Sequence, residues 1–302
     1  MAKQDHINRF TLNNRYLFKG QLVMRTALHI GGGRVTLSNS DSPVVLTPEE
    51  IPFIPGSSFK GSLRSTVEKI VPNLPGNLRT CSLIEQNDVS DEVVEQARVY
   101  DMPICPTARQ SGIIQERRAI TDKIAQEEYR EQVIDDLCHT CQLFGSPFAA
   151  SHIAINDLYM PEGEWNDIIQ QRDGVAIDRD SEKAKDRLKY DFEVVPASAT
   201  FDLEITLENA TPQDLQLISV GLSEFVHGFG TIGGKRSRGL GACALNELHV
   251  YTLELTNINE KERNERLRNY LLGKTLEAKF AGRQTGQEFL EQYINQLFAG
   301  IS

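Results

Sequence analysis

The alternation of apolar and polar residues predicts strands at several places along the chain. Residues 17–30 (LFKGQLVMRTALHI) alternate as a half-buried strand does. Strand character returns at residues 151–160, at 192–208, which fit a strand pair or one long bent strand, and at 242–255. Residues 163–191 are strongly polar and charged, and predict a projecting hairpin or a mobile loop.

A first helix is predicted to follow the turn at residues 52–58. Ser57 and Ser58 are suitable N-caps for a helix that runs to about Val71, and Pro72 and Pro75 would stop it. Residues 211–226 predict a second core helix. Without the insertions, the order is β-α-β-β-α-β. This order predicts an α+β, ferredoxin-like core, which RNA-recognition domains also use.

Two further segments lie outside this core. Residues 76–150 are expected to be an insertion with mixed charge, several prolines and only partial helix, at 91–99 and 122–138. Residues 256–302 are expected to form a helical tail, with helices at 259–272 and 286–298.

Composition and charge limit the function. The 302 residues could form one elaborated domain or two, and 40% hydrophobic content can build a core. The net charge of −10 argues against non-specific coating of nucleic acid, although a basic stripe on an acidic body remains compatible. No apolar stretch approaches a transmembrane span, and the first ten residues lack the core of a signal peptide. We therefore expect a soluble cytoplasmic protein that does not bind a membrane.

The most informative segment is residues 228–241 (GFGTIGGKRSRGLG), which contain six glycines, three basic residues and no acidic one. Bare backbone beside positive charge suits a phosphate chain. The segment contains G-x-G-x-x-G, but it follows a predicted helix and precedes a predicted strand, which is the reverse of a dinucleotide site. A flexible basic turn is the structural alternative. The predicted contacts come from Gly228, Gly230, Gly233, Gly234, Lys235, Arg236, Arg238 and Gly239.

A second glycine-containing basic segment, residues 54–64 (IPGSSFKGSLR), lies at the predicted start of the first helix. Helix N-termini offer unpaired amides and a positive dipole, and residues four apart share one helix face. An ordinary capped helix with solvated cations is the alternative. The predicted phosphate contacts are Gly56, Ser57, Ser58, Lys60 and Arg64.

Four of the five cysteines fall in the insertion. Cys138 and Cys141 form a C-x-x-C pair, and Cys81 and Cys105 lie upstream. A four-thiolate zinc site is feasible and would hold together a segment with little core, whereas free thiols are the alternative. Cys243 lies in a predicted strand and is expected to be a small buried hydrophobe.

Asp41 and His29 are two further candidates for chemistry. Asp41 lies in a polar loop, where a carboxylate usually forms a turn. His29 precedes three glycines and is expected to be structural. No Ser-His-Asp order, H-E-x-x-H motif or paired-carboxylate spacing is visible.

Together these segments resemble the RAMP superfamily of CRISPR effector proteins, and among them the backbone subunits of type III complexes. The resemblance covers most of the chain, in order. It rests on the motifs LHIGGG (28–33), SDSPVVL (40–46), PFIPGSSFKGSLRS (52–65), CHTCQLFGSPFAASHIAINDL (138–158), RDGVAIDRDSEKAKDRLKYDFEVVP (172–196) and GFGTIGGKRSRGLGACAL (228–245).

The resemblance implies a modified RNA-recognition core over residues 1–302 with a thumb-like hairpin within 163–191. Copies or relatives would stack along a guide RNA, and each thumb would flip a base of the paired target. The glycine-rich loop, Lys60 and Arg64 would hold guide phosphates, and the cysteine-rich insertion would bind zinc. Asp41, directly before Ser-Pro-Val, matches the family's target-cutting aspartate.

The resemblance also implies chemistry and partners. The family cuts target RNA with a divalent cation such as Mg²⁺ or Mn²⁺, by attack of a ribose 2′-OH on the adjacent phosphate. The partners would be a guide crRNA, a target RNA, neighbouring RAMP subunits and a large polymerase-cyclase-like subunit in a prokaryotic cytoplasm. Two alternatives stay open, namely a purely structural RNA-binding subunit and, from another class, a dinucleotide-dependent enzyme.

Overall fold

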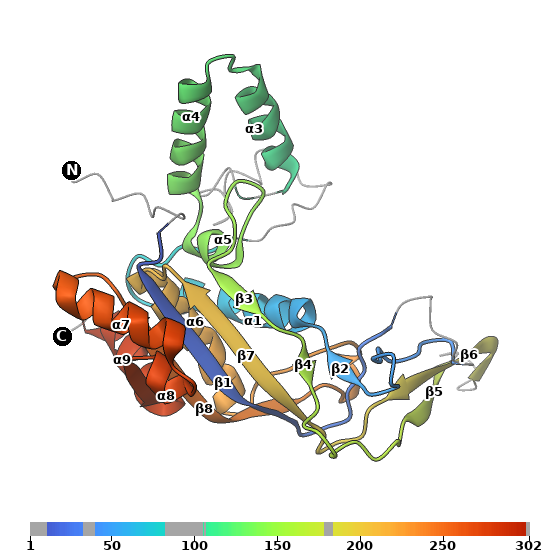
Figure 1. Ribbon diagram of the computed structural model, residues 1–302. Coiled ribbons are helices and arrows are strands. Elements are labelled where there is room, and N and C mark those ends of the chain that lie inside the picture. Colours follow the sequence, from blue (N-terminus) through green and yellow to red (C-terminus); the bar gives the residue numbers. More distant parts are fainter. Residues whose placement is uncertain (1–10, 33–39, 82–104, 106, 178–183, 300–302) are drawn as a thin grey trace.

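A central antiparallel sheet organises the chain. The computed structural model describes residues 11–32, 40–81, 105, 107–177 and 184–299, and within them five strands form this sheet in the order β3-β7-β1-β8-β9 (Figure 1). Helix α1 (Gly56–Ile70) follows β1, and α6 (Pro212–Val226) follows β7. The core strands in chain order are therefore arranged 2-3-1-4, which confirms the predicted ferredoxin-like fold. The strands span β1 Asn14–Met24, β3 Ile153–Ile155, β7 Thr200–Glu208, β8 Cys243–Glu254 and β9 Gly282–Thr285.

Helices α1, α6 and α9 (Gly286–Phe298) cover one face of the sheet and lie behind it in Figure 1. Alternate residues of β1 and β7 point into this layer, because side chains along a strand point to opposite faces in turn. Phe59 of α1 packs on Phe225 of α6 with ring centroids 5.0 Å apart, and both rings are fully buried. Each such ring contributes roughly 1.5–3 kcal/mol of burial free energy.

Local signals fix the ends of the helices. At the start of α6, Thr211 accepts a hydrogen bond from the Asp214 amide, and the Asp214 carboxylate accepts one from the Thr211 amide. Pro212 follows at the first helical position, which needs no amide donor. Thr285 and Glu288 repeat this capping box at α9.

The opposite face of the sheet is only partly covered. Helices α7 (Glu260–Leu272) and α8 (Leu276–Lys279) pack on one end of it, through a small apolar cluster that includes Leu17, Leu253 and Phe280. The rest of this face carries polar side chains.

Two structures project from the core at different ends (Figure 1). One is a pair of helices, α3 (Thr107–Ala119) and α4 (Lys123–Asp136), followed by the short α5 (His139–Phe144). The other is a two-stranded ribbon of β5 (Gln170–Ile177) and β6 (Ala184–Val194). Shorter elements complete the fold: β2 (Phe53–Ile54) pairs with β4 (Leu158–Tyr159), and one-turn helices span η2 Val71–Asn73 and η4 Arg236–Arg238.

Several sequence-based boundaries were wrong. β1 leaves the sheet at Met24, six residues early, because the following segment bridges Val195 beside the ribbon. The strand expected at 151–160 is split between β3 and β4, which belong to different sheets. The helix α3 and the strand β9 were not foreseen, and the helix expected at 91–99 lies outside the described residues.

The N-cap prediction for α1 was also wrong. The cap residue is Pro55, so Ser57 and Ser58 lie inside the first turn. Pro55 has no side chain that can cap this end, and the Asp157 carboxylate accepts a hydrogen bond from the Gly56 amide at 2.7 Å instead. In the part of the chain that is described, no helix is both long and apolar enough to cross a membrane.

Candidate functional site

The four insertion cysteines come together in space. Cys81, Cys105, Cys138 and Cys141 are all buried, and their sulfur atoms lie within 4.8 Å of one another. Cys81 Sγ lies 3.4 Å from Cys138 Sγ and 3.5 Å from Cys141 Sγ, which is far beyond a disulfide bond. Tetrahedral zinc with bonds of about 2.3 Å needs sulfurs about 3.8 Å apart. The donor set and its spacing therefore fit a zinc ion.

The start of α5 shapes this cluster. Cys138 is the N-cap of α5 and accepts a hydrogen bond from the Cys141 amide at 3.4 Å, while the Cys138 amide donates to Cys105 Sγ at 3.4 Å. Hydrogen bonds from the Cys105, Cys138 and Cys81 thiols lower the pKa of Cys141, and the charge of Arg64 acts in the same direction. Hydrogen bonds within the same cluster raise the pKa of Cys81 and that of Cys138. A bound metal would hold the cysteines as thiolates.

Of the two cations of α1, Arg64 contacts the insertion and Lys60 contacts the residues that directly follow it. Lys60 Nζ donates to Ser151 Oγ at 2.9 Å, and burial lowers the pKa of Lys60. Arg64 makes hydrogen bonds with Glu68, Gly145 and Cys141. Both residues are only partly exposed. Their predicted role as guide-phosphate ligands stays a prediction, and the structure adds protein contacts that sequence reasoning did not foresee.

Most glycines at the two basic segments serve backbone packing. A Cβ at Gly56 would lie 2.3 Å from the Ile155 carbonyl oxygen, and one at Gly230 would lie 2.3 Å from the Phe225 ring. Gly233 has φ +81° and would place a Cβ 2.4 Å from the His29 carbonyl oxygen. The fold therefore needs these glycines for turns and close approach, whatever ligand they meet.

This packing makes a prediction for the loop that joins α6 to β8. Gly241→Ala should destabilise the fold by several kcal/mol, because φ is +80° and the new Cβ would lie 2.0 Å from the Ile232 carbonyl oxygen. Gly239→Ala is the matched control, since φ is +81° but nothing lies within 4 Å, so only the cost of about 1 kcal/mol for a left-handed residue applies. Chemical denaturation of both variants measures the difference, and equal losses would contradict the packing argument.

The basic residues of the loop rest on the base of the ribbon. Lys235 Nζ lies 4.4 Å from the centroid of the Phe192 ring and 5.6 Å from that of Tyr190. Arg238 lies over the Tyr190 ring at 5.8 Å and donates a hydrogen bond to its hydroxyl. Arg236 is exposed. The loop thus presents its charges next to β6, on a support of aromatic rings.

Asp41 also meets β6, from the other side. The Asp41 amide donates to Asp191 Oδ1 at 2.7 Å, and the Asp191 amide donates to Asp41 Oδ2 at 3.2 Å. Ser40 Oγ and Gln171 Nε2 donate to the same Asp191 carboxylate at 2.9 and 2.6 Å. Asp41 itself is exposed. Its carboxylate is therefore held at the base of the ribbon and faces solvent.

Sequence reasoning did not show that β6 contacts both the basic loop and Asp41. Tyr190 and Phe192 face the basic loop, whereas Asp191 faces Asp41 and Glu193 receives a hydrogen bond from the Val44 amide at 3.0 Å. The signal was the alternation in KYDFEV, which places aromatic and acidic side chains on opposite faces. His29 is buried, and its ring lies 2.7 Å from the Glu193 carbonyl oxygen, as expected for a structural histidine.

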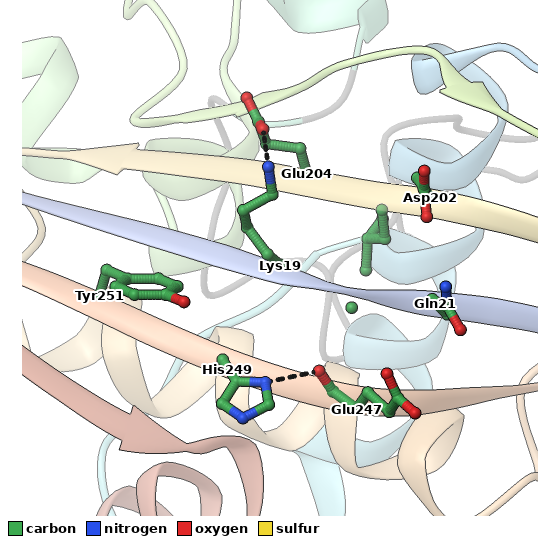
Figure 2. A pocket seen from close by; sticks show the side chains of 9 residues that line it. Lys19, Gln21, Asp202, Glu204, Glu247, His249 and Tyr251 are labelled. Carbon is green, nitrogen blue, oxygen red and sulfur yellow. Dashed lines mark hydrogen bonds and ion pairs between the residues drawn. The ribbon is translucent and has the colours of Figure 1, made fainter. Parts of the chain in front are cut away.

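The open part of the sheet face contains a pocket that, unlike the basic loop, is lined by several acidic side chains (Figure 2). RNA-recognition domains stack bases on aromatic side chains of this face. Here the labelled side chains include the carboxylates of Asp202, Glu204 and Glu247, and Lys19 is paired with Glu204 at 3.0 Å. The aromatic residue of the pocket, Tyr251, is buried. This acidic face therefore disfavours a phosphate backbone.

The loop geometry also bears on the dinucleotide alternative. Helix α6 precedes the glycine loop and β8 follows it, so the described chain does not pass from a strand through these glycines into an α-helix, as a dinucleotide site requires. The order predicted from the sequence is confirmed.

Known proteins match the chain over most of its length. A family model described as the RAMP superfamily matches residues 21–244. A protein of Enterococcus italicus named CRISPR system Cms endoribonuclease Csm3 is 27% identical over an alignment of 231 residues, and the match covers 72% of this chain and 86% of the relative. A protein of the same name from Streptococcus thermophilus is 25% identical over 256 residues, 83% of this chain and 95% of the relative. The family match spans well over half of the residues, and the chain therefore belongs to the RAMP superfamily.

Proposed function

We propose that this protein is a backbone subunit of a type III CRISPR effector, which binds a guide crRNA and cuts the target RNA paired with it. The observation that carries the proposal is the arrangement at the base of the ribbon. One strand, β6, supports two features. Tyr190 and Phe192 support the basic loop, and Asp191 supports the exposed Asp41. The names of the two relatives support an endoribonuclease over a purely structural subunit.

The loop would contact guide phosphates, because Lys235, Arg236 and Arg238 are its only charged side chains and all are basic. Guide pairing would supply sequence specificity, while the protein reads backbone and shape. Gly56, Ser57, Ser58 and Lys60 would extend this contact at α1. The β5–β6 ribbon would act as the thumb that separates guide from target.

Asp41 would act at the reacting ribose. The 2′-oxygen attacks the adjacent phosphorus, the bond from phosphorus to the 5′-oxygen breaks, and a 2′,3′-cyclic phosphate and a 5′-OH result. The proton leaves the 2′-OH as the new bond forms, and the departing 5′-oxygen gains one. A flipped nucleotide can reach the in-line geometry that A-form pairing forbids. Asp41 would position the 2′-OH or a hydrated cation.

At Asp41, the protein could offer a divalent cation only one or two carboxylate ligands. Among the described residues, no group of three or more metal-ligating side chains includes Asp41. Mg²⁺ tolerates such a site because it keeps several of its waters and takes few protein ligands. When bound, Mg²⁺ or Mn²⁺ would stabilise the negative charge that develops on the phosphate.

The remaining partners follow from the same proposal. Zinc would occupy the four-cysteine cluster as a structural ion. Neighbouring RAMP subunits and a large polymerase-cyclase-like subunit would complete the assembly around the guide.

Removing the loop charges tests the RNA-binding part. Changing Lys235, Arg236 and Arg238 together to glutamine should weaken guide binding and lower the slope of log affinity against log salt by about 0.7 for each lost phosphate contact. Filter binding at several salt concentrations measures both. Lys19→Gln, on the acidic sheet face, removes one charge and should change neither. A triple variant with wild-type affinity and slope would overturn the proposed guide contact.

A further inference from the structure

Arg64 lies beside the cysteine cluster rather than in open solvent. Its side chain is 13% exposed and sits on the face of α1 that meets the insertion. Nε donates to Glu68 Oε1 at 2.8 Å, and a terminal nitrogen donates to Cys141 Sγ at 3.3 Å. The guanidinium carbon lies 5.9 Å from the centroid of the Phe144 ring. A phosphate could reach this group only by competing with these contacts.

The charge of a four-thiolate site explains why a cation is useful there. Four thiolates around Zn²⁺ carry a net charge of −2, and a buried excess charge is costly unless a partner offsets it. Within the described residues, the N–H donors to these sulfurs are the amides of Cys138 and Cys141 and the guanidinium of Arg64. The contacts between the sulfurs lose their protons when all four are thiolates. Arg64 is the cationic side chain among these N–H donors.

We propose that Arg64 is a positioning residue of the metal centre. Its N–H group donates to the Cys141 sulfur, offsets part of the excess negative charge and ties helix α1 to the insertion. Partners of this kind orient metal ligands and tune their affinity. The proposal goes beyond the RNA function and does not depend on it, although it requires that the cysteines bind zinc.

The guanidinium geometry makes Arg64 hard to replace. One planar group serves Glu68, Gly145 and Cys141 at once. Lysine would keep the charge but has a single ammonium on a shorter side chain, and glutamine would keep an amide NH2 donor without the charge. Comparing the two separates the contribution of charge from that of the hydrogen bond.

The test is zinc affinity of the full chain, measured by competition with a chromogenic chelator. Arg64→Gln should lower the affinity about 10–100-fold, and Arg64→Lys should lose less. In the Co²⁺-loaded protein, the sulfur-to-metal charge-transfer band should shift in Arg64→Gln. Lys60→Gln is the matched control, because Lys60 lies one turn earlier on α1 and donates to Ser151 and Ile153. It should keep the zinc affinity and the band.

Three results would overturn the proposal. The first is a wild-type chain that binds no zinc. The second is an Arg64→Gln variant whose zinc affinity and Co²⁺ spectrum equal those of the wild type. The third is an equal loss of zinc affinity in Lys60→Gln and Arg64→Gln, which would point to general loosening of α1. If Arg64 serves guide phosphates instead, Arg64→Gln would weaken RNA binding and leave zinc affinity unchanged.

Discussion

Replacing Asp41 with asparagine is expected to abolish target-RNA cutting and to leave guide binding intact. The asparagine side chain keeps the shape and the oxygen that accepts from the Asp191 amide, so the loop should hold its place. It loses the charge that a hydrated cation or a reacting 2′-OH requires. Removal of such a group slows a reaction about 10²–10⁴-fold. Cutting of a labelled, guide-complementary RNA by the assembled complex measures the effect.

The control for this variant is Asp202→Asn. Asp202 is an exposed carboxylate on the sheet face, so its loss changes the net charge equally without touching the ribbon base. Cutting should continue at the wild-type rate. If Asp41→Asn complexes cut at every wild-type position with the wild-type rate, Asp41 is not the cutting carboxylate and the structural-subunit alternative gains support.

Removal of zinc is expected to unfold the cysteine-rich insertion. The apolar cluster there is small and includes the four cysteines themselves, with Val133, Leu137, Phe148 and Ala149 as its other buried members. A segment with so little core depends on its metal, and structural zinc contributes about 10–16 kcal/mol to folding in isolated zinc-finger peptides. Chelation or Cys138→Ser should therefore expose α3 and α4 to limited proteolysis, and metal analysis of the wild type should give about one zinc per chain.

Cys243→Ser provides the matched substitution outside the cluster. Burial in β8 raises the pKa of Cys243 to about 12, so this residue remains a neutral thiol and behaves as a small apolar side chain. The variant should lose about 1–3 kcal/mol of stability, because it buries a hydroxyl in the core, and it should keep its zinc. A metal-free preparation of the wild type with a protease-resistant insertion would refute the metal assignment.

The core of the fold could be predicted from the sequence because its signals are local. The Thr211-Pro212-Gln-Asp214 capping box begins α6, and apolar alternation marks β7 and β8. The end of β1 could not be predicted, since Leu28 is as apolar as a sheet residue but bridges Val195 instead of a sheet strand. Pairing partners far apart in sequence decide such boundaries, and the local pattern does not contain them.

The site was predictable by residue type but less so by arrangement. The four thiols suggested a metal, but the wide separation of Cys81 and Cys105 in the sequence did not show that all four sulfurs would lie within 4.8 Å of one another. Arg64 looked like a phosphate ligand because its spacing from Lys60 places both on one helix face. Which neighbour that face meets depends on tertiary packing, here the Cys141 sulfur.

The alternation along the last residues of β6 has a consequence for how this protein can vary in length. Tyr190 and Phe192 face one way, and Asp191 and Glu193 face the other. Inserting or deleting one residue within this stretch would exchange the two faces and turn acids toward the basic loop and aromatics toward Asp41. One such change would therefore remove both the aromatic contacts with the basic loop and the hydrogen bonds to Asp41. Natural or engineered relatives should therefore gain or lose residues elsewhere in the hairpin. Within residues 190–193 they should do so only two residues at a time.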